Sequence, residues 1–445
     1  MRNTFSGPPH RSASPVRRSR LTKALATAAT ATLVLGATAA CGGNSDPTKS
    51  AEQKKLGGSD KLTLTTFGEF GYDSLIEEWN AAHPDIQVEQ TKVSKWDDWK
   101  NELNTNLQAG SGLPDVVALE GDFMPAVVAN PDAWVDLSSP DLDGRWLEFK
   151  SDAATTSDGR LFGYATDAGP EAICYRADLF ARAGLPTDRA EVAALIGTWD
   201  DYFATGKQFK AEVADAAWYD ASGSIAQAML NQVEFPFEKA DNTVAVDNDE
   251  LRAIYDTVAA HVDLGTKAPQ WSDDWTAAFS KDGIATVPCP GWMRANIRSN
   301  TGEPAPDGVI WDIADVFPGG GGNWGGSYLS VPKSSAHQAE AKEFAAWITA
   351  PEQQLKVFAE TGNFPSQVAA LEDPELLAAT DAYFNDAPAG EIFSNRAAAI
   401  TVQPHHGPLY SDILGKFQDA INRVDQGKDP DDSWKTFLSD VDALQ

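Results

Sequence analysis

The fold of this chain is decided by one stretch, residues 61–122, which reads KLTLTTFGEFGYDSLIEEWNAAHPDIQVEQTKVSKWDDWKNELNTNLQAGSGLPDVVALEGD. Three runs in it have the apolar alternation of strands, and they lie at 61–67, 86–93 and 114–122. Between them, large apolar residues recur at helical spacing in two runs, at 73–83 and 95–110. The order strand, helix, strand, helix, strand with short connections predicts a parallel sheet covered by helices.

Polar residues stand where two of these strands end. Glu69 and Phe70 follow the first strand, and Glu120 and Asp122 close the third. Ligands of parallel α/β sheets bind beyond the carboxyl ends of the strands, so these residues are candidates for a binding site. Carboxylates accept hydrogen bonds from more than one hydroxyl, although loop acids are also common without any binding role.

Composition limits the partners that this chain can have. Its 445 residues suffice for two or three domains with a sizeable core, and 42% of them are hydrophobic. The formal net charge of -30 argues against nucleic acid and against anionic lipid surfaces. The chain has 14 Trp, a high count. An indole offers a large apolar face, which suits a protein core and also suits a sugar ring that stacks on it.

The first forty residues are expected to be a signal peptide, 1–40. A basic start without acids precedes an apolar run that is too short and too rich in Ala and Thr for a membrane span. Small residues then lead to Cys41, as in a bacterial lipoprotein box where this Cys is lipidated; an ordinary cleaved signal is the alternative. Residues 41–57 then form the lipid anchor and a flexible tether. Arg17-Arg18 leaves both Sec and twin-arginine export open.

A glycine segment, residues 319–326, opens the stretch GGGGNWGGSYLSVPKSS. A phosphate-binding loop would need Lys-Ser or Lys-Thr at a helix start after its glycines. Here the glycines lead instead into an alternating run that stops at Pro332. This segment lies between a second predicted α/β section, 173–288, and a mainly helical C-terminal part.

Four motifs together carry a resemblance to a known family. They are WNAAHPDIQV with LQAGSGLPDVVAL (79–88 and 107–119), AICYRADLFARAGLP (172–186), FSKDGIATVPCPGWMRANI (279–297) and GGNWGGSYLSVPKSSAHQAEAKEFAAWI (321–348). In order and spacing they resemble the extracytoplasmic solute-binding lipoproteins of bacterial ABC sugar importers, the maltose-binding-protein-like family. The resemblance covers nearly all of residues 60–445.

The resemblance implies an α/β, two-lobed periplasmic-binding-protein fold. Each lobe is then a largely parallel sheet covered by helices. Three crossovers join the two lobes, and the ligand cleft lies between them. Motif positions put 58–172 plus 289–333 in the N-terminal lobe and 173–288 plus 334–445 in the C-terminal lobe. The glycine segment then lines the cleft, where backbone without Cβ atoms approaches the ligand. Cys174 and Cys289 fall in segments that resemble neighbouring crossover strands, so a disulfide between them and two free thiols both stay open.

Sugars are bound by aromatic faces and by polar side chains that meet hydroxyls. The predicted sugar-binding residues are Glu69, Phe70, Glu120, Asp122, Asp167, Trp271, Trp292, Asn323, Trp324, Gly325 and Asn363. Trp275 is expected to pack in the core. His405-His406 resembles half a metal site, but without further ligands nearby it is interpreted as surface or cleft-lining. No metal and no cofactor are expected.

The predicted function is to bind a di- or oligosaccharide and deliver it to an ABC permease. We expect a non-enzymatic monomer, lipid-anchored to the outer face of the cell membrane of an actinobacterium. Cellobiose, a cello-oligosaccharide or xylobiose is the ligand guess. A secreted carbohydrate-active enzyme and a non-transport adhesion or signalling lipoprotein are the alternatives. No serine-hydrolase, zinc-protease or Walker motif supports an enzyme, and acids are too numerous for a glycosidase pair to be recognised.

Overall fold

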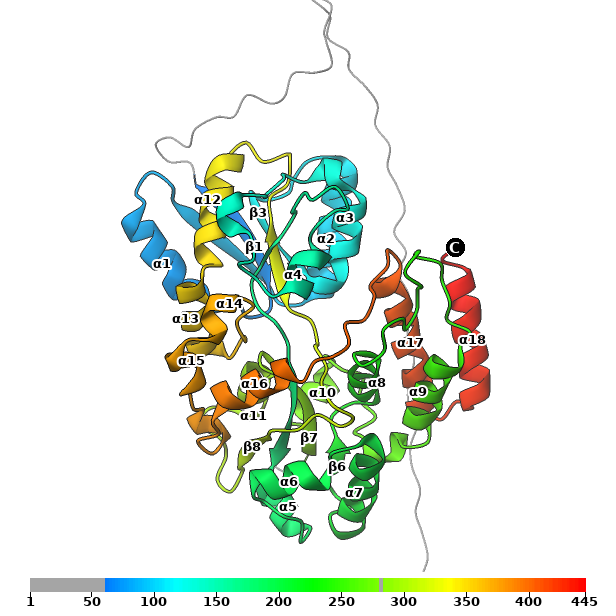
Figure 1. Cartoon of the computed structure of the whole chain (residues 1–445). Helices are drawn as coiled ribbons and strands as arrows, with labels where there is room; N and C mark the ends of the chain where they lie inside the picture. Colours follow the sequence, from blue (N-terminus) through cyan, green and yellow to red (C-terminus); the bar gives the residue numbers. More distant parts are fainter. Residues whose placement is uncertain (1–60, 280–282) are drawn as a thin grey trace, which may run out of the picture. The chain divides into compact units, whose positions relative to one another are not determined.

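The computed structural model describes residues 61–279 and 283–445, which belong to one compact unit (Figure 1). The predicted signal peptide, the tether and Cys41 lie outside the described residues. Helices and sheets alternate along the chain, and the strands gather into two sheets. We call each sheet with the helices that pack on it a lobe.

The first lobe contains residues 61–122. Its sheet has the order β2-β1-β3-β9-β4. The strands are β1 (Leu62–Phe67), β2 (Val88–Val93), β3 (Val116–Glu120), β4 (Tyr164–Ala165) and β9 (Ser327–Ser330). As predicted, β1 pairs in parallel with β2 and β3, and helices α1 (Asp73–Ala82) and α2 (Trp96–Ala109) connect these strands. The alternating runs bury their apolar side chains together with those of the helices, Trp79 and Trp99 among them.

The second lobe has a four-stranded sheet of order β6-β7-β5-β8. Its strands are β5 (Glu171–Arg176), β6 (Ala217–Tyr219), β7 (Ile284–Pro290) and β8 (Trp311–Ala314). Only β6 and β7 pair in parallel, because β5 runs antiparallel to both of its neighbours. In the first lobe, β9 is likewise antiparallel to β3 and β4. Both sheets are therefore mixed rather than largely parallel, since strands that arrive from the other lobe enter against the local direction.

The remaining helices cover the sheets. They are α3 (Met124–Ala129), α4 (Glu148–Ala153), α5 (Ala177–Arg182), α6 (Arg189–Leu195), α7 (Trp199–Glu212), α8 (Ser222–Leu230), α9 (Asp249–Ala259), α10 (Asp273–Ala277), α11 (Met293–Thr301), α12 (Gln338–Ile348), α13 (Pro351–Thr361), α14 (Val368–Leu371), α15 (Pro374–Leu377), α16 (Ala389–Ala398), α17 (Tyr410–Asp425) and α18 (Pro430–Asp442). Short 3-10 turns are η1 (Gly121–Phe123), η2 (Pro131–Ala133), η3 (Pro140–Leu142), η4 (Val262–Leu264) and η5 (Ala382–Phe384). Side chains of the second sheet form one hydrophobic core cluster with α5 to α9, α17 and α18. Other side chains of this sheet form a second hydrophobic cluster with α10, α11 and α16.

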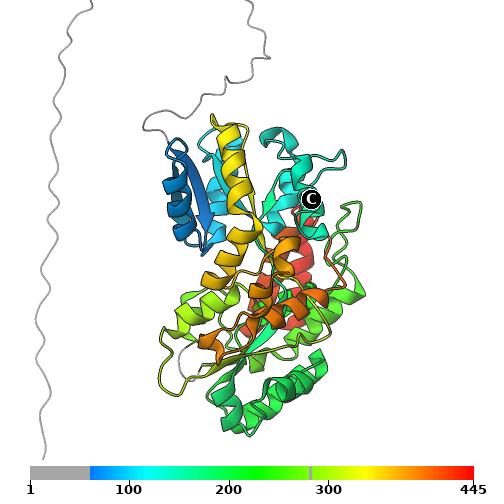
Figure 2. The same cartoon turned by 60° about the vertical axis from the view of Figure 1, so that its left-hand side comes forward.

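The sheets divide the chain differently from the expected ranges 58–172 plus 289–333 and 173–288 plus 334–445. Helix α11 and strand β8 belong to the second lobe, because β8 pairs with β5 and buries Trp311 and Ile313 beside Cys174. Helix α12 belongs to the first lobe, where Phe344 and Ile348 join the core around β9. Figures 1 and 2 both show α12, in yellow, beside the blue strands of the first sheet. The expected boundaries therefore assign 293–314 and α12 to the wrong lobes.

Three segments carry the chain between the lobes, and they hydrogen bond to one another. An isolated bridge joins Ala168 to Phe364, and a second joins Pro170 to Asn323. The chain thus crosses beside β4 and β5, through the glycine segment before β9, and again after α13. Backbone pairing of all three segments makes one narrow connection between the lobes.

Cys174 on β5 and Cys289 on β7 form a disulfide, with their Cα atoms 5.4 Å apart. The two residues lie diagonally across an antiparallel pair, because Cys174 is opposite Val287 and Cys289 is opposite Ala172. Both strands belong to the second sheet. The disulfide that the sequence left open is therefore present, and it ties two neighbouring strands of the second sheet.

Candidate functional site

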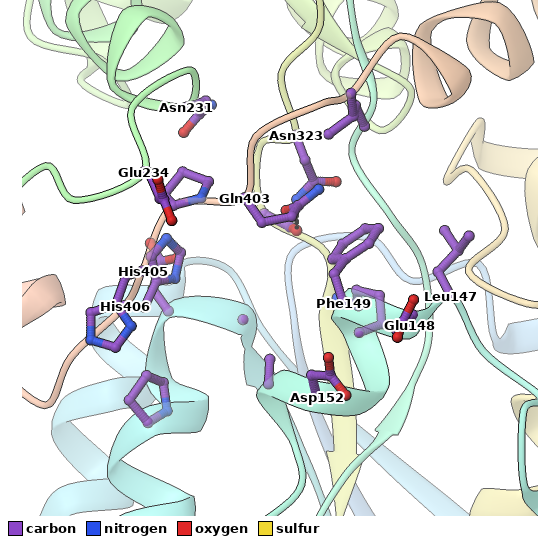
Figure 3. Close-up of a pocket in the computed structure, with 18 of the residues that line it drawn as sticks. Leu147, Glu148, Phe149, Asp152, Asn231, Glu234, Asn323, Gln403, His405 and His406 are labelled. Atoms are coloured by element: carbon purple, nitrogen blue, oxygen red, sulfur yellow. Dashed lines mark hydrogen bonds and ion pairs between the residues drawn. The ribbon is translucent and has the colours of Figure 1, made fainter. Parts of the chain in front are cut away.

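A cavity of about 1030 Å³ lies where the two lobes meet. The first lobe contributes Gly121, Asp122 and a wall from α3 to α4, including Phe149 and Lys150. The second lobe contributes Asn231, Glu234, Gln403, His405 and His406 among others. Figure 3 shows Phe149, Glu148 and Asp152 facing Glu234, His405 and His406 across the opening. The cavity is thus built from segments far apart in sequence.

Four predicted site residues line this cavity, namely Asp122, Asn323, Trp324 and Gly325. The amide of Asn323 is held by the chain, since its Oδ1 accepts from the Gly169 N–H at 2.9 Å and its Nδ2 donates to the Gly325 carbonyl at 3.1 Å. Asn323 therefore shapes the wall by fixing the crossing segments.

Close packing explains why one position of the glycine segment, Gly326, is a glycine. Gly326 has φ +91°, and a Cβ there would lie 2.7 Å from the carbonyl oxygen of Asp167 and 2.7 Å from Lys150 Nζ. A side chain at this position would be strained and would collide with the neighbouring crossing segment. The glycine segment thus permits the tight pairing of the crossings at the cavity wall.

A row of indole rings runs through the second lobe beside the cavity. Ring centroids of Trp275 and Trp271 are 4.8 Å apart, those of Trp271 and Trp292 are 6.0 Å apart, and those of Trp292 and Trp324 are 5.7 Å apart. Trp292 also donates its indole N–H to the Trp324 carbonyl at 3.0 Å. Three predicted stacking residues, Trp271, Trp292 and Trp324, are therefore brought together, and Trp275 is buried at their end as expected.

Trp271 is the unusual member of this row. Its side chain is 40% exposed, and its backbone has φ +67°, a left-handed conformation that non-glycine residues adopt rarely. Such strain persists only where the surrounding structure enforces it, and it concentrates at functional sites. Trp275, which anchors the row, donates its own N–H to buried Asp220 at 2.8 Å. The row is thus fixed at one end and presents an exposed ring.

The first lobe places an aromatic group of its own near this row. Phe67 contacts both Phe70 and Trp96, and the centroid of its ring lies 5.3 Å from that of Phe70 and 4.9 Å from that of Trp96. Lys95, next to Trp96, donates from Nζ to the Trp271 carbonyl at 3.1 Å. That contact brings the two aromatic groups together across the lobes. Phe70 itself is buried, so its ring is chiefly a packing element.

Glu69 and Asn363 meet outside the cavity wall. Asn363 donates from Nδ2 to the Glu69 carbonyl at 3.2 Å, while the exposed Glu69 carboxylate accepts from the Gly71 N–H at 3.0 Å and lies 3.6 Å from Lys92 Nζ. The Asn363 side chain therefore joins the third crossing segment to the end of β1. The Glu69 carboxylate keeps solvent access.

Glu120 and Asp167 lie on either side of β9. Glu120 ends β3 opposite Ser327. Asp167 is buried and accepts from the Thr166 hydroxyl and the Ser327 N–H, both at 2.7 Å, through the same Oδ1. Burial raises its pKa, which the nearby Lys150 and these hydrogen bonds oppose. Asp167 thus fixes the start of β9, a structural task that its predicted role in sugar binding did not include.

Asp122 makes a contact between the lobes that sequence reasoning missed. Its carboxylate lies 3.1 Å from His406 Nδ1, and the His406 ring stacks on Tyr410 with centroids 3.7 Å apart. His405 and His406 both line the cavity, which confirms their interpretation as cleft-lining. The partner of His406 is an acid from the other lobe, which adjacency in sequence could not indicate.

Lys100 forms a second link of this kind. From α2 in the first lobe, its Nζ donates to the Ser411 hydroxyl at 2.7 Å and lies 3.4 Å from the Asp412 carboxylate, both on α17 in the second lobe. Together with Lys95 and Asp122, Lys100 forms what we call the interlobe contacts. They hold the lobes together through polar groups of the chain itself.

Phe149 and Lys150 are cavity residues for which the sequence gives no signal. They lie in the short helix α4 within WLEFKSDAA, which matches no binding motif. A lysine in such a helix is ordinarily expected at the surface. Only the fold shows that Lys150 is buried at the cavity wall.

Comparisons with known proteins agree with this architecture. The chain is 46% identical to an extracellular solute-binding protein of family 1 of known crystal structure, with a TM-score of 0.77 and coverage of 86% of this chain and 99% of that one. An arabinooligosaccharide-binding protein of Bacillus subtilis (strain 168) is 24% identical over 393 residues, which are 82% of this chain and 86% of the relative. The ABC transporter associated binding protein from B. animalis subsp. lactis Bl-04, solved with beta-1,6-galactobiose, has the same fold at 21% identity, a TM-score of 0.73 and coverage of 86% and 96%.

A family model confirms the resemblance that the motifs carried. The model for bacterial extracellular solute-binding proteins matches residues 74–385. Within the described residues, no helix is both long and apolar enough to cross a membrane. Because the family match spans residues 74–385, the chain belongs to the bacterial extracellular solute-binding proteins, a family that acts outside the cytoplasm.

Proposed function

We propose that this protein binds a di- or oligosaccharide between its two lobes and delivers it to the permease of an ABC importer. The observation that carries the proposal is the indole row, in which the strained and exposed Trp271 contacts Trp292, and Trp292 in turn contacts Trp324. Indole faces stack on the C–H patches of sugar rings, and successive rings in a row suit successive sugar units. A single small solute would not need so long a platform.

The relatives support the same class of ligand. One is named for arabinooligosaccharides, and another was solved with beta-1,6-galactobiose. Cellobiose, cello-oligosaccharides and xylobiose remain our specific proposals, and the relatives add arabinose and galactose oligomers to the ligands to test. The net charge of -30 favours a neutral sugar over a strongly anionic one.

We further propose that sugar binding changes the relation of the lobes. A ligand favours closure only if it contacts both lobes, and the narrow connection of paired crossing segments gives few residues to bend. The closed form would then be the one that docks on the permease. Cys41 would carry the lipid that keeps the protein at the outer face of the membrane, and binding would proceed without turnover.

Calorimetric titration of residues 61–445 against the named oligosaccharides tests the binding. One class of linkage should bind with a micromolar or lower Kd, and Trp292→Ala should weaken it at least tenfold because a stacking face is lost. Trp347→Phe, at a helix α12 position away from the row, is the matched control. Absence of binding across the panel would refute a sugar ligand.

The same samples separate the alternatives. Chromatography of the sugar after incubation should show no product, and product formation would favour the carbohydrate-active enzyme. X-ray scattering should show a smaller radius of gyration with the bound sugar. Binding without compaction would favour a non-transport lipoprotein, because delivery to a permease depends on closure.

A further inference from the structure

Lys150 is an unusual lysine because its side chain is buried. Only 2% of the residue is exposed, yet it lies on the wall of the interlobe cavity. Its Nζ stands 4.0 Å from the centre of the Tyr328 ring. Within the described residues, this ammonium forms no ion pair and no hydrogen bond, and the charges of Asp167 and Asp122 act on it from a longer distance. Buried cations ordinarily have such a partner.

The electrostatic surroundings leave the ammonium incompletely compensated. Burial lowers the pKa of Lys150 to about 8, and the charges of Asp167 and Asp122 only partly oppose that effect. The Asp167 carboxylate already accepts from Thr166 and Ser327, and Asp122 is paired with His406. The three ammonium N–H groups therefore retain capacity for an acceptor that enters the cavity.

Whereas the Lys150 ammonium needs a hydrogen-bond acceptor, the rim of the cavity needs hydrogen-bond donors. Glu148, Asp152 and Glu234 line it with exposed carboxylates, and in the described part of the chain none of the three has an ion-pair partner. A ligand must therefore accept a hydrogen bond at Lys150 and donate hydrogen bonds at the rim. An anion would be repelled by the three acids, and a cation would be repelled by Lys150. A hydroxyl group both donates and accepts, so it satisfies both demands.

We propose that this cavity is a binding subsite for a neutral saccharide unit, anchored by the Lys150 ammonium. The proposal rests on the proposed function, since Trp324 belongs both to the indole row and to the cavity wall and so connects the two. Phe149 supplies an apolar face on the opposite wall. The subsite extends the indole row from the second lobe to the first, so that one oligosaccharide contacts both.

The test compares wild type, Lys150→Met and a control, Lys435→Met, which removes an exposed lysine on α18. Arabinotriose, beta-1,6-galactobiose, cellobiose and xylobiose are titrated calorimetrically at pH 7 and pH 9. Loss of a hydrogen bond from a charged donor should raise Kd for the bound sugar by about tenfold to a hundredfold in Lys150→Met at pH 7. The control should bind like wild type.

The pH profile separates an anchor from a structural lysine. The ammonium is present below its pKa of about 8 and is lost above it, so wild-type affinity should fall between pH 7 and pH 9. The other groups around Nζ are Asp167, Asp122 with its partner His406, and Tyr328, whose pKa burial raises. Lys150→Met should bind with the same affinity at both pH values. Its melting temperature should equal or exceed that of wild type, because no ion pair is broken.

The outcomes can be told apart. Wild-type affinity in Lys150→Met, or a lower melting temperature with unchanged binding, would overturn the subsite and leave the proposed function intact. Binding of none of the four sugars to wild type would overturn the proposed function, and the saccharide subsite with it.

Discussion

The disulfide between β5 and β7 should account for a large part of the stability of the second lobe. The perturbation is the double variant Cys174→Ala with Cys289→Ala. The bond closes a loop with a sequence separation of 115 residues. In the chain-entropy model this loop costs the unfolded state about 16 cal/mol/K, which is about 4.8 kcal/mol at 25 °C. Measured losses for native disulfides fall at about 2–5 kcal/mol, so we expect a loss within that range.

Guanidinium unfolding followed by tryptophan fluorescence measures this loss. Trp218 and Trp311 are buried in the second lobe and report its unfolding. Reduced wild type is the matched control, because its thiols fill the same buried space without the cross-link. Reduced wild type and the double variant should therefore unfold at similar denaturant concentrations, both well below oxidised wild type.

A loss below about 1 kcal/mol in both forms would refute this reasoning. Such a small loss would mean that residual structure already restricts the unfolded chain, so that the disulfide removes little further entropy from it. It could also mean that the hydrogen bonds between β5 and β7 stabilise the pair without the disulfide. Sugar affinity at a temperature well below the transition should be unchanged in the double variant, because both sulfurs lie in the core and away from the cavity wall.

Three further perturbations follow from buried or bridging groups. Burial raises the pKa of Asp220 to about 6, although its hydrogen bonds oppose this shift. Between about pH 4 and pH 6 the folded state therefore keeps the Asp220 proton, whereas the unfolded state loses it. Wild type should lose about 3 kcal/mol of stability over that window from this group, and urea unfolding of Asp220→Asn should show that part of the pH dependence removed. Lys100→Ala breaks the contact with Asp412, and scattering of the sugar-free protein should show more open lobes, with the closed-to-open ratio reduced by about threefold to fivefold. His406→Ala should have a similar effect, and equal scattering profiles for wild type and both variants would show that the interlobe contacts do not restrain the lobes.

Sequence pattern predicted the local elements of the first lobe well. The alternation in 61–67 and the spacing of Trp96, Trp99 and Leu103 identify β1 and α2, because period reports which face is buried. The pattern could not predict where β8 and α12 belong. Periodicity shows that their apolar residues are buried but not on which sheet. The lobe of β8 follows from its hydrogen-bond pairing with β5, and the lobe of α12 follows from its packing around β9.

Residue type alone pointed to only part of the candidate site. Trp271, Trp292 and Trp324 were each predicted to contact the sugar, and the structure places them in one row. Lys150 was missed because a lysine in a short polar helix gives no sign of burial, which depends on β9 and the crossing segments. For Asp167, predicted to contact the ligand, the structure adds a structural role, because its Oδ1 accepts from the Thr166 hydroxyl and the Ser327 N–H.

The position of β9 also governs the order in which the polypeptide can be completed. Strand β3 is synthesised early, but its neighbour β9 is synthesised only after all strands of the second sheet. Until then Glu120 on β3 lacks its pairing partner Ser327 on β9. During synthesis β3 therefore presents an open row of amides and carbonyls, and such edges recruit strands from other molecules. The short β4 cannot cover it, since β4 joins the sheet only through β9. A nascent chain that ends before Ser327 therefore has an exposed strand edge, and the cell must keep this edge from pairing with other copies of the chain until β9 has been made.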